Sequence, residues 1–450
     1  MTPELVLKYA KPVPRYTSYP TAPHFHSGVD HAVAAGWLAS LAPAERLSLY
    51  IHIPFCRSLC WFCGCHTRIT GRDAPVQRYL ASLRQEIGLV GTRLEGPRQI
   101  GHLHLGGGTP SLLHPDDLER LGEALHRYFS IAREAEIAVE IDPRTLDLDR
   151  AGALAKFGVN RVSLGVQDFD PSVQRAINRE QTFGLTARVI DMLRGNGIGR
   201  FNIDLMYGLP LQSVGGMADT VGKAIELKAD RISLFGYAHV PWLKKHQTMI
   251  DETMLPNAWQ RWCQARSAMR QIVAAGYVAI GLDHFARPDD TLARAARQGA
   301  LRRNFQGYTA DPASALIGLG SSAIGSLPAG YVQNSVDANG YSAALQSGRL
   351  PIVRGLRLTR EDRLRAGIIE RLMCDLAVDF GVLCRTFDFA SNHLDAVIPR
   401  LEDLAADGLV EVDGRRLAVA DEARLLVRTV AACFDAYLEP GVETRHAPSI

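Results

Sequence analysis

The chain has 450 residues, 47% of them hydrophobic, which is enough to bury a large core and to form two or three structural units. Its formal net charge of +2, without a long basic or acidic block, argues against nucleic acid as a partner. The N-terminal segment lacks the apolar core of a signal peptide, and no run of about 18 uncharged apolar residues occurs. We therefore expect no membrane span and, because cysteines cluster in a chain without an export signal, a cytoplasmic location.

Six short apolar stretches alternate with longer amphipathic segments between residues 47 and 240. The amphipathic segments, such as 74–90 and 114–129, carry apolar residues at the helical spacings of three and four. Strands alternating with helices predict parallel β/α units with right-handed crossovers. Six units are fewer than the eight of a closed barrel, so the sequence predicts an α/β fold with an incomplete (β/α)6 parallel barrel, open on one side. The expected strands are residues 47–54, 100–107, 135–142, 160–166, 201–208 and 230–237.

A different pattern begins at about residue 358. A helical region starts there, with Thr359 as a candidate N-cap and Asp362 three residues later. Residues 401–421 predict a helix followed by a hairpin, and residues 422–438 predict a long closing helix. This arrangement resembles a winged helix, and because the net charge is nearly neutral we expect a lid or docking surface rather than DNA binding. The predicted domains are an N-terminal extension over the barrel mouth (1–45), the barrel (46–357) and a mainly helical C-terminal domain (358–450).

Four cysteines lie within ten residues, directly after the first expected strand. Cys56, Cys60 and Cys63 have the spacing C-x₃-C-x₂-C, and Cys65 follows. Thiolates this close together bind soft metals, and without a second Cys/His pair at the usual spacing an iron–sulfur cluster fits better than zinc. Three ligands leave one iron of a four-iron cluster open for chemistry. The spacing alone also allows Cys65 as a fourth ligand, which would close the cluster and restrict it to electron transfer.

Polar or glycine-rich residues follow each of the six expected strands. In parallel barrels the reactive groups gather at the carboxyl ends of the strands, so these residues predict a single site. One Asp or Gln at a strand end often only caps the next helix, but a cluster at all six ends favours a functional site. After the cysteines, the clusters are Gly106–Pro110, Glu140–Pro143, Gly165–Phe169, Asn202 with Asp204, and Tyr237–His239.

Longer motifs are spread over nearly the whole chain: PRYTSYPTA (14–22), YIHIPFCRSLCWFCGC (50–65), HLGGGTP (104–110), GVQDF (165–169), NRE (178–180), NIDLMYGLP (202–210), HFARPDD (284–290) and RNFQGYT (303–309). With these motifs the sequence resembles the radical S-adenosylmethionine enzymes, and more narrowly the family of oxygen-independent coproporphyrinogen III oxidases. The resemblance implies an oxidoreductase of haem biosynthesis. Such an enzyme converts the ring A and B propionates of coproporphyrinogen III to vinyl groups through a 5′-deoxyadenosyl radical, giving protoporphyrinogen IX.

Three alternatives share parts of this pattern. Haem-trafficking chaperones keep the cysteine triad but typically lack the PRYTSYPTA segment and the fourth cysteine, both of which are present here. A radical enzyme that degrades haem is the second alternative. A closed-cluster electron carrier, which would not cleave S-adenosylmethionine, is the third.

The resemblance also implies which residues form the site. Cys56, Cys60 and Cys63 hold a [4Fe–4S] cluster, whose free iron is chelated by S-adenosylmethionine. Cys65 and Glu140 are the catalytic candidates, Cys65 as a non-ligating residue on the substrate side or in proton handling. An electron donor and an acceptor are required but not identified, and we expect a monomer. Two S-adenosylmethionine molecules are implied, the first at Tyr50, Gly107, Glu140 and Ile324, and the second at Phe62, Gly108, Thr109, Gln167, Arg179, Asp204 and Ala238.

A substrate with four propionates requires cations. Arg15, Arg287, Arg302 and Arg303 lie in segments that match the family, and the sequence does not choose among them. The PRYTSYPTA segment precedes the first strand, so we expect it to fold over the barrel mouth. Its Tyr16 and Tyr19 are candidates either for lining that mouth or for packing.

Overall fold

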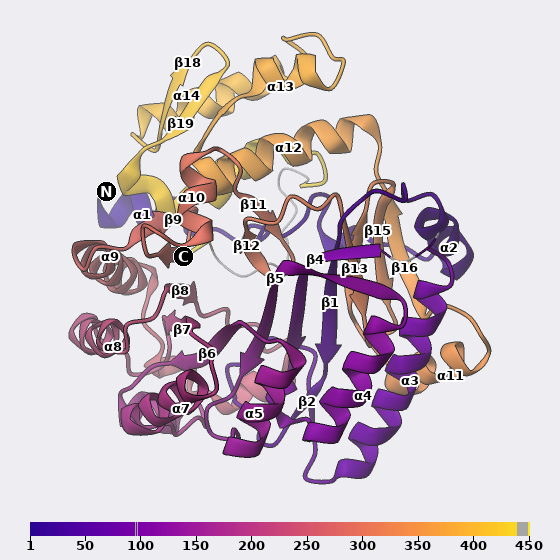
Figure 1. Ribbon diagram of the computed structural model, residues 1–450. Coiled ribbons are helices and arrows are strands. Elements are labelled where there is room, and N and C mark those ends of the chain that lie inside the picture. Colours follow the sequence, from indigo (N-terminus) through magenta and orange to yellow (C-terminus); the bar gives the residue numbers. More distant parts are fainter. Residues whose placement is uncertain (95, 97, 439–448) are drawn as a thin grey trace.

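The computed structural model describes residues 1–94, 96, 98–438 and 449–450. A 12-stranded sheet forms its centre, and six of its parallel strands are neighbours in chain order, with helices along their outer side (Figure 1). These strands coincide with the six predicted stretches, which confirms the incomplete parallel barrel. They are β1 (Leu47–Ile53), β4 (Arg98–Gly107), β5 (Phe129–Ile141), β6 (Arg161–Gln167), β7 (Arg200–Tyr207) and β8 (Arg231–Gly236). The covering helices include α3 (Asp73–Gly91), α4 (Pro115–His126), α5 (Leu148–Phe157), α6 (Pro171–Ala176), α7 (Phe183–Gly195), α8 (Val214–Glu226) and α9 (Ala258–Ala274).

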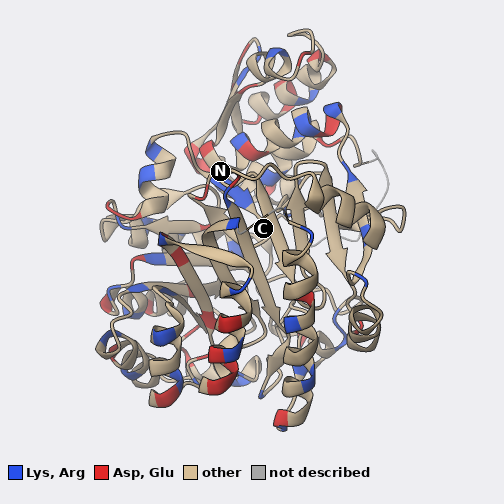
Figure 2. Cartoon of the chain, turned by 45° about the vertical axis from the view of Figure 1, so that its right-hand side comes forward, with Lys and Arg blue, Asp and Glu red and all other residues tan. Residues whose placement is uncertain are grey.

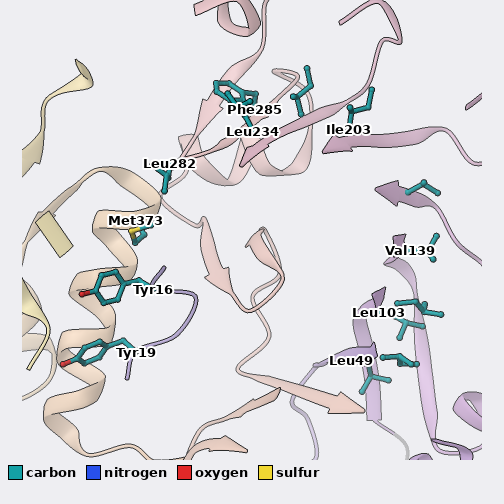
Figure 3. Packing of buried hydrophobic residues seen from close by; sticks show 14 of the residues in the cluster. Tyr16, Tyr19, Leu49, Leu103, Val139, Ile203, Leu234, Leu282, Phe285 and Met373 are labelled. Atoms are coloured by element: carbon teal, nitrogen blue, oxygen red, sulfur yellow. The ribbon is translucent and has the colours of Figure 1, made fainter. Parts of the chain in front are cut away.

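Side chains alternate along these strands between an apolar outer face and a polar inner face, as the pleat of a strand requires. Figure 3 shows the outer layer, to which five strands contribute the buried residues Leu49, Leu103, Val139, Ile203 and Leu234. The positions between them carry polar side chains, and the strand register sets these side by side. Tyr50 is paired with His104, Glu140 with Ser163, and Asp204 with Ser233. The inner face of the barrel is therefore a column of polar groups that must bond to one another or to a ligand.

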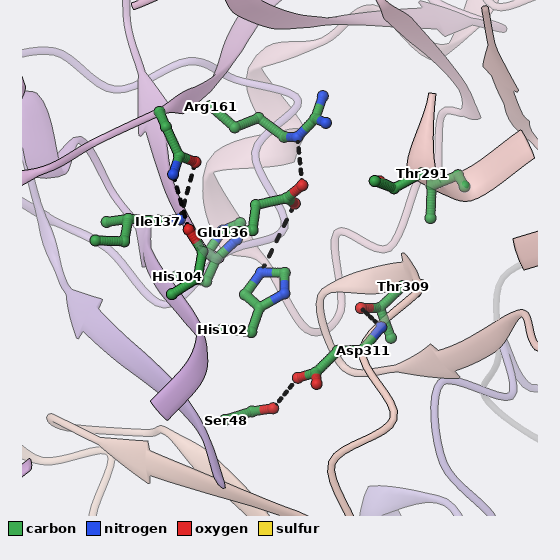
Figure 4. A network of polar contacts seen from close by, with 12 residues as sticks. Ser48, His102, His104, Glu136, Ile137, Arg161, Thr291, Thr309 and Asp311 are labelled. Carbon is green, nitrogen blue, oxygen red and sulfur yellow. Dashed lines mark hydrogen bonds and ion pairs between the residues drawn. The ribbon is translucent and has the colours of Figure 1, made fainter. Parts of the chain in front are cut away.

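An ion network fills the barrel at the amino ends of the strands (Figure 4). The guanidinium of Arg161 lies 2.9 Å from Glu136 and 3.1 Å from Asp290, and that of Arg231 lies 3.5 Å and 2.8 Å from the same two carboxylates. Burial alone raises the pKa of Glu136, but Arg231 and Arg161 outweigh it and lower that pKa to about 2. Asp290 also caps α10 (Thr291–Arg297), so the network ties this helix to the floor of the barrel.

Six further strands extend the sheet beyond the predicted barrel. On one edge β13 (Ala315–Leu319) pairs parallel to β1, followed by the antiparallel strands β14 (Ile324–Leu327), β15 (Gly330–Asn334) and β16 (Ile352–Arg357). On the other edge lie β10 (His284–Ala286) and β9 (Val278–Ile280). These strands were not predicted, because each has only three to six residues, too few to show a clear alternation of apolar and polar side chains.

The C-terminal region is helical with a small sheet, as predicted. Thr359 and Asp362 form a capping box at the start of α12 (Arg360–Asp375), and the predicted hairpin turns at Asp413 and Gly414. The order of helix, strand, two helices and hairpin is that of the expected winged-helix arrangement. The remaining elements are β17 (Ala377–Asp379), α13 (Phe380–Thr386), α14 (Ile398–Ala406), β18 (Val410–Asp413) and β19 (Arg416–Val419).

The single long helix predicted over 422–438 is wrong. The structure has a 3₁₀ segment at Asp421–Leu426, a short helix α15 at Val427–Ala431 and a second 3₁₀ segment at Ala432–Phe434. Side chains on all sides of this stretch are buried, including Arg428, whose guanidinium donates to the carbonyl of Ser449 at 2.7 Å. Packing on every side therefore overrides the intrinsic helix propensity of the segment.

The N-terminal segment packs against the C-terminal region. Lys8 and Tyr9, at the end of α1 (Pro3–Tyr9), both bond to Asp407. Tyr16 donates its hydroxyl to Asp435 at 3.0 Å, and the hydroxyl of Tyr19 accepts a hydrogen bond from the backbone of Ala436 at 2.9 Å. Both tyrosines are buried on the side of the core where Figure 3 shows Met373 of α12. Of the two roles open for them, packing is the one observed.

Replacing Glu136 by Gln should lower the free energy of unfolding at pH 7 by about 3 kcal/mol, because two buried guanidiniums lose a carboxylate that they share. The pKa of Glu136 is depressed below its ordinary value of 4.5 to about 2, so the carboxylate stabilises the fold above about pH 4.5. That stabilisation is lost as the pH falls toward 2. When urea unfolding is followed by circular dichroism, the difference in free energy of unfolding between the unaltered protein and Glu136→Gln should narrow steadily below pH 4.5.

Glu134→Gln is the matched control. Glu134 lies on the same strand but is exposed, and its ion pair with Arg46 spans 2.5 Å. An exposed pair contributes less than about 1 kcal/mol. Equal destabilisation by both substitutions would contradict the role given to the buried network.

Candidate active site

A cavity of about 640 Å³ opens at the carboxyl ends of the barrel strands. Its wall continues the polar inner face of the sheet, through Glu140, Ser163 and Asp204. The cysteine loop also lines it, as do segments from outside the barrel that include Arg15 and Arg428. Most of the predicted site residues line this one space: Cys56, Cys60, Phe62, Cys63, Cys65, Gly107, Gly108, Thr109, Glu140, Gln167, Arg179, Asp204 and Ala238.

Tyr50 and Ile324 are the predicted site residues that do not line the cavity. Tyr50 lies on the inner face of β1, where its hydroxyl is 3.0 Å from His52 and its ring lies against His104. Ile324 begins β14 and packs in a separate apolar cluster with Tyr331 and Leu356. Their predicted contact with S-adenosylmethionine stays a prediction.

The cysteine loop is held between two parts of the barrel. Its first residues form β2 (Phe55–Cys56), which pairs with β3 (Arg68–Ile69). The backbone of Trp61 donates to the carbonyl of Ile177 at 3.0 Å. On the other side, His246 contacts the carbonyl of Cys63 at 2.7 Å, and Gln247 donates to that of Phe62 at 3.0 Å. These contacts fix the backbone of the loop independently of any metal.

The donor groups around the thiols suit an iron–sulfur cluster. Thr109 donates to the sulfur of Cys56 at 3.4 Å, while Arg144 and Arg179 each place a guanidinium nitrogen 3.4 Å from the sulfur of Cys60. Such hydrogen bonds to sulfur stabilise the negative charge of a thiolate-bound cluster. Within the described residues, no three His, Cys, Asp or Glu side chains are arranged to hold a single metal ion.

Glycines let the floor of the site approach the cysteine strand. A Cβ on Gly108 would lie 2.6 Å from the backbone oxygen of Phe55. Gly107 has φ +110°, and a Cβ there would lie 2.5 Å from the ring of His52. Only glycine fits either position, so the residue pattern at 106–108 follows from the closeness of two backbones.

Two half-buried carboxylates in the wall, Glu140 and Asp204, have opposite electrostatic surroundings. Burial alone raises the pKa of Glu140, but hydrogen bonds from His104 at 3.1 Å and from the backbone of Gly107 at 3.0 Å outweigh it and lower that pKa. Burial raises the pKa of Asp204, although Ser163 and Asn202 each donate to it at 2.7 Å. Glu140 is therefore a fixed anion, whereas Asp204 is the easier of the two to protonate.

The lining of the cavity is rich in arginines. Of the four arginines left open by the sequence, Arg15 and Arg303 line the cavity. Arg287 instead donates to the carbonyl of Ala229 at 3.2 Å, and Arg302 is exposed. Asp142, from the predicted cluster Glu140–Pro143, lines the cavity, and lining residues that were not predicted include Ser163, Arg261, Asp283, His284 and Arg428. The sequence pattern could have indicated Ser163, because it lies in an expected strand. Arg261 and Arg428 occur in helical patterns, where no local signal marks them as cavity residues.

Comparison with known proteins identifies the class. Residues 50–223 match the family model of the radical SAM superfamily, and residues 358–426 match that of the HemN C-terminal domain. The chain is thus a radical SAM protein, a superfamily whose members use a [4Fe–4S] cluster and S-adenosylmethionine. Within the described residues, no helix combines the length and apolar character that crossing a membrane requires.

Relatives narrow the class to one family. The chain is 50% identical to the oxygen-independent coproporphyrinogen III oxidase of Bradyrhizobium diazoefficiens over 98% of both chains, and 41% identical to that of Pseudomonas aeruginosa over 97% of this chain and 95% of the relative. The structure of coproporphyrinogen III oxidase (HemN) from Escherichia coli superposes with a TM-score of 0.90 at 38% identity, covering 97% of this chain and 99% of that one. The chain belongs to the family of oxygen-independent coproporphyrinogen III oxidases. These matches favour the oxidase over the haem chaperone and the haem-degrading enzyme.

Replacing Cys60 by Ser should remove most of the iron and the visible absorption from the anaerobically reconstituted protein, because serine is a poor ligand for the cluster. Cys56→Ser and Cys63→Ser should do the same. Cys65→Ser is the control and should keep the full iron content, since Cys65 is predicted not to bind the cluster. If Cys65→Ser lost as much iron as the other three, Cys65 would be a fourth ligand and the cluster would have no open iron.

Proposed function

We propose that the cavity holds a [4Fe–4S] cluster on Cys56, Cys60 and Cys63, two S-adenosylmethionine molecules beside it, and coproporphyrinogen III on its cationic side. The activity is the oxygen-independent conversion of coproporphyrinogen III to protoporphyrinogen IX that defines the family. One observation supports the proposal above others: thiols, glycine-lined backbone, carboxylates and arginines all face one space. When bound, the cluster and S-adenosylmethionine supply the radical chemistry.

The wall of the cavity offers complementary groups for S-adenosylmethionine. Its amino group and ribose hydroxyls are donors, and Glu140 and Asp204 are half-buried acceptors that line the cavity. Its carboxylate needs a cation, and Arg179 is already directed toward this place by Asp142 at 3.3 Å and by the carbonyl of Gly165 at 2.6 Å. Phe62 adds an aromatic face for adenine or the methionyl chain. The proposal keeps the predicted division: the first molecule at Tyr50, Gly107, Glu140 and Ile324, and the second at Phe62, Gly108, Thr109, Gln167, Arg179, Asp204 and Ala238.

Arg15 and Arg303 are the best placed of the expected cations to bind propionates. Arg303 lies on β11 (Arg302–Asn304), where its guanidinium stacks over Tyr308 at 4.6 Å and donates to the carbonyl of Arg15 at 3.5 Å. The two cations therefore approach the same part of the cavity. Pairing a propionate with each offsets the cost of holding two guanidiniums close together.

The arrangement of the whole chain supports this assignment. We propose the predicted boundaries, 1–45, 46–357 and 358–450, as functional units: an extension that covers the mouth, the radical SAM catalytic domain, and a C-terminal domain that acts as a lid. Arg15 and Thr17 of the extension and Leu425 and Arg428 of the C-terminal domain line the cavity beside the barrel residues. A monomer in the cytoplasm, with a separate electron acceptor, completes the proposal.

The reconstituted protein, supplied anaerobically with dithionite, S-adenosylmethionine and coproporphyrinogen III, should form protoporphyrinogen IX. Two 5′-deoxyadenosine molecules should appear per product, one for each propionate. Equilibrium dialysis without substrate should give two bound S-adenosylmethionine molecules per chain. Cleavage of S-adenosylmethionine without any vinyl product, or tight haem binding without turnover, would overturn the proposed function.

Replacing Arg303 by Gln should raise the KM for coproporphyrinogen III by about ten- to a hundredfold, because a charge-assisted hydrogen bond contributes about 1.5–3 kcal/mol. Arg302→Gln is the matched control. Arg302 is the preceding residue of β11, and successive strand residues point to opposite faces. Its KM should stay within about twofold, because surface substitutions shift free energies by only about 0.5 kcal/mol. An equal rise in both variants would contradict a specific propionate contact.

A further inference from the structure

Four carboxylate side chains lie in the described lining of the cavity, and the proposed function assigns a role to three of them. Glu140 and Asp204 are acceptors for S-adenosylmethionine, and Asp142 directs Arg179. The fourth is Asp283, which has no role in that assignment. On the outer helices Lys and Arg are interspersed with Asp and Glu (Figure 2), and solvent stabilises the charges there. Inside a cavity a carboxylate is costly to bury unless it is paired, so the position of Asp283 requires a reason.

The carboxylate of Asp283 has one side-chain partner within the described residues. It lies 2.8 Å from Nδ1 of His284, its neighbour in the chain, and only 16% of the Asp283 side chain is exposed. A carboxylate has about four acceptor positions, so most of its bonding capacity remains open. The backbone is fixed, because the carbonyl of Asp283 accepts a hydrogen bond from the amide of Leu234 on β8 at 2.8 Å. The side chain is therefore held at a set place in the wall with acceptor positions to spare.

Two arginines act on Asp283 through their charge without pairing with it. Burial alone raises the pKa of Asp283. The hydrogen bond with His284 and the charges of Arg303 and Arg15 outweigh burial and lower that pKa, so Asp283 is an anion. Within the described residues neither arginine forms an ion pair with Asp283, since Arg15 donates to the carbonyl of Gly236 at 3.3 Å and Arg303 to that of Arg15 at 3.5 Å. Nε and Nη1 of Arg303 are buried and have no hydrogen-bond partner in the described part of the chain. The cavity thus holds a fixed anion beside cations that still have donors to offer.

A porphyrinogen has the complementary pattern of groups. Its four pyrrole N–H groups are hydrogen-bond donors at the centre of the ring, and its propionates are anions at the periphery. Saturated methylene bridges let the pyrroles tilt, so the N–H groups can point to one face of the macrocycle. A carboxylate beside two guanidiniums fits this pattern, because the carboxylate accepts from the N–H groups while the guanidiniums bind propionates.

We propose that Asp283 accepts hydrogen bonds from the pyrrole N–H groups of the porphyrinogen and so determines specificity for the reduced macrocycle. The inference rests on the proposed function, because it adds a contact to the same substrate. In the oxidised porphyrin the ring is planar and two of the four nitrogens carry no hydrogen, so a carboxylate that faces the ring gains much less. The propionates are the same in both ligands. Asp283 therefore distinguishes the oxidation state of the ring, whereas the arginines recognise its carboxylates.

The test compares coproporphyrinogen III with coproporphyrin III, which carry the same four propionates. Their dissociation constants are measured by anaerobic calorimetry on the reconstituted full-length protein, without an electron donor so that no turnover occurs. The unaltered protein should prefer coproporphyrinogen III, and Asp283→Asn should reduce that preference by about ten- to a hundredfold, the size of a charge-assisted hydrogen bond. Arg303→Gln should weaken both ligands by a similar factor and leave the preference within about twofold, because it removes a propionate contact that both ligands make.

Asp289→Asn is the matched control, since Asp289 is an exposed carboxylate shortly after β10 and is not among the described residues that line the cavity. It should keep the full preference. Asp283→Ala is a second variant and should lose the preference as Asp283→Asn does. A preserved preference in both Asp283 variants, or a loss of S-adenosylmethionine binding in them, would overturn the inference.

Equal affinity of the unaltered protein for the two ligands would also overturn the role of Asp283, even where a variant does not fold. Failure of the unaltered protein to form protoporphyrinogen IX with dithionite and S-adenosylmethionine would refute the proposed function instead. The preference measured by calorimetry would then still decide whether Asp283 recognises the reduced ring.

Discussion

The site depends on the alternation of side chains along the barrel strands. A strand buried on both faces is usually apolar throughout. In this barrel, alternate residues of each strand face the interior, and many of them are polar, such as Glu140, Ser163 and Asp204. These groups cannot be left unpaired in a low-dielectric interior. At the amino ends they satisfy one another through Glu136, Asp290 and two arginines. At the carboxyl ends they line the cavity, where groups such as Asp204 still offer bonding capacity to a ligand.

The same arrangement explains why the cysteine loop and the glycine-rich turn occur on neighbouring strands. β1 and β4 are hydrogen-bonded partners, so the loops that follow them leave the sheet side by side. The backbone of Gly108 donates to the carbonyl of Ile53 at 2.9 Å, and that of Thr109 donates to the carbonyl of Phe55 at 2.8 Å. A side chain at Gly108 would force these backbones apart and carry the donor of Thr109 away from Cys56. The three thiols are therefore positioned by the sheet and its turns.

Much of the fold could be predicted from sequence because its signals are local. The six barrel strands, the capping box at Thr359 and the hairpin at Asp413 and Gly414 each depend on a few adjacent residues. β13–β16 were missed because strands of four to six residues are too short to show a clear alternation of apolar and polar side chains. The prediction of one long helix over 422–438 was wrong, because Arg428 and its neighbours are buried on all sides and this packing breaks a helix that the local pattern favours. Arg261 and Arg428 were missed for the same reason, since only tertiary structure brings them to the cavity.

The cavity has two halves of different origin, and this bears on how the family could vary. The half beside the cysteines comes from the ends of β1 and β4–β8, whose positions are fixed by the strand register. The cationic half comes from segments outside the parallel barrel, with Arg15 before β1, Arg303 on a two-stranded ribbon and Arg428 in the C-terminal domain. Changes in these outer segments can alter the fit to a substrate without moving the thiols. Changes in the strands would also disturb the rest of the wall, because an inner side chain of the wall is held by its neighbour across the sheet, as Asp204 is by Ser163. The radical chemistry is therefore the constrained part of the molecule, and substrate recognition the adaptable part.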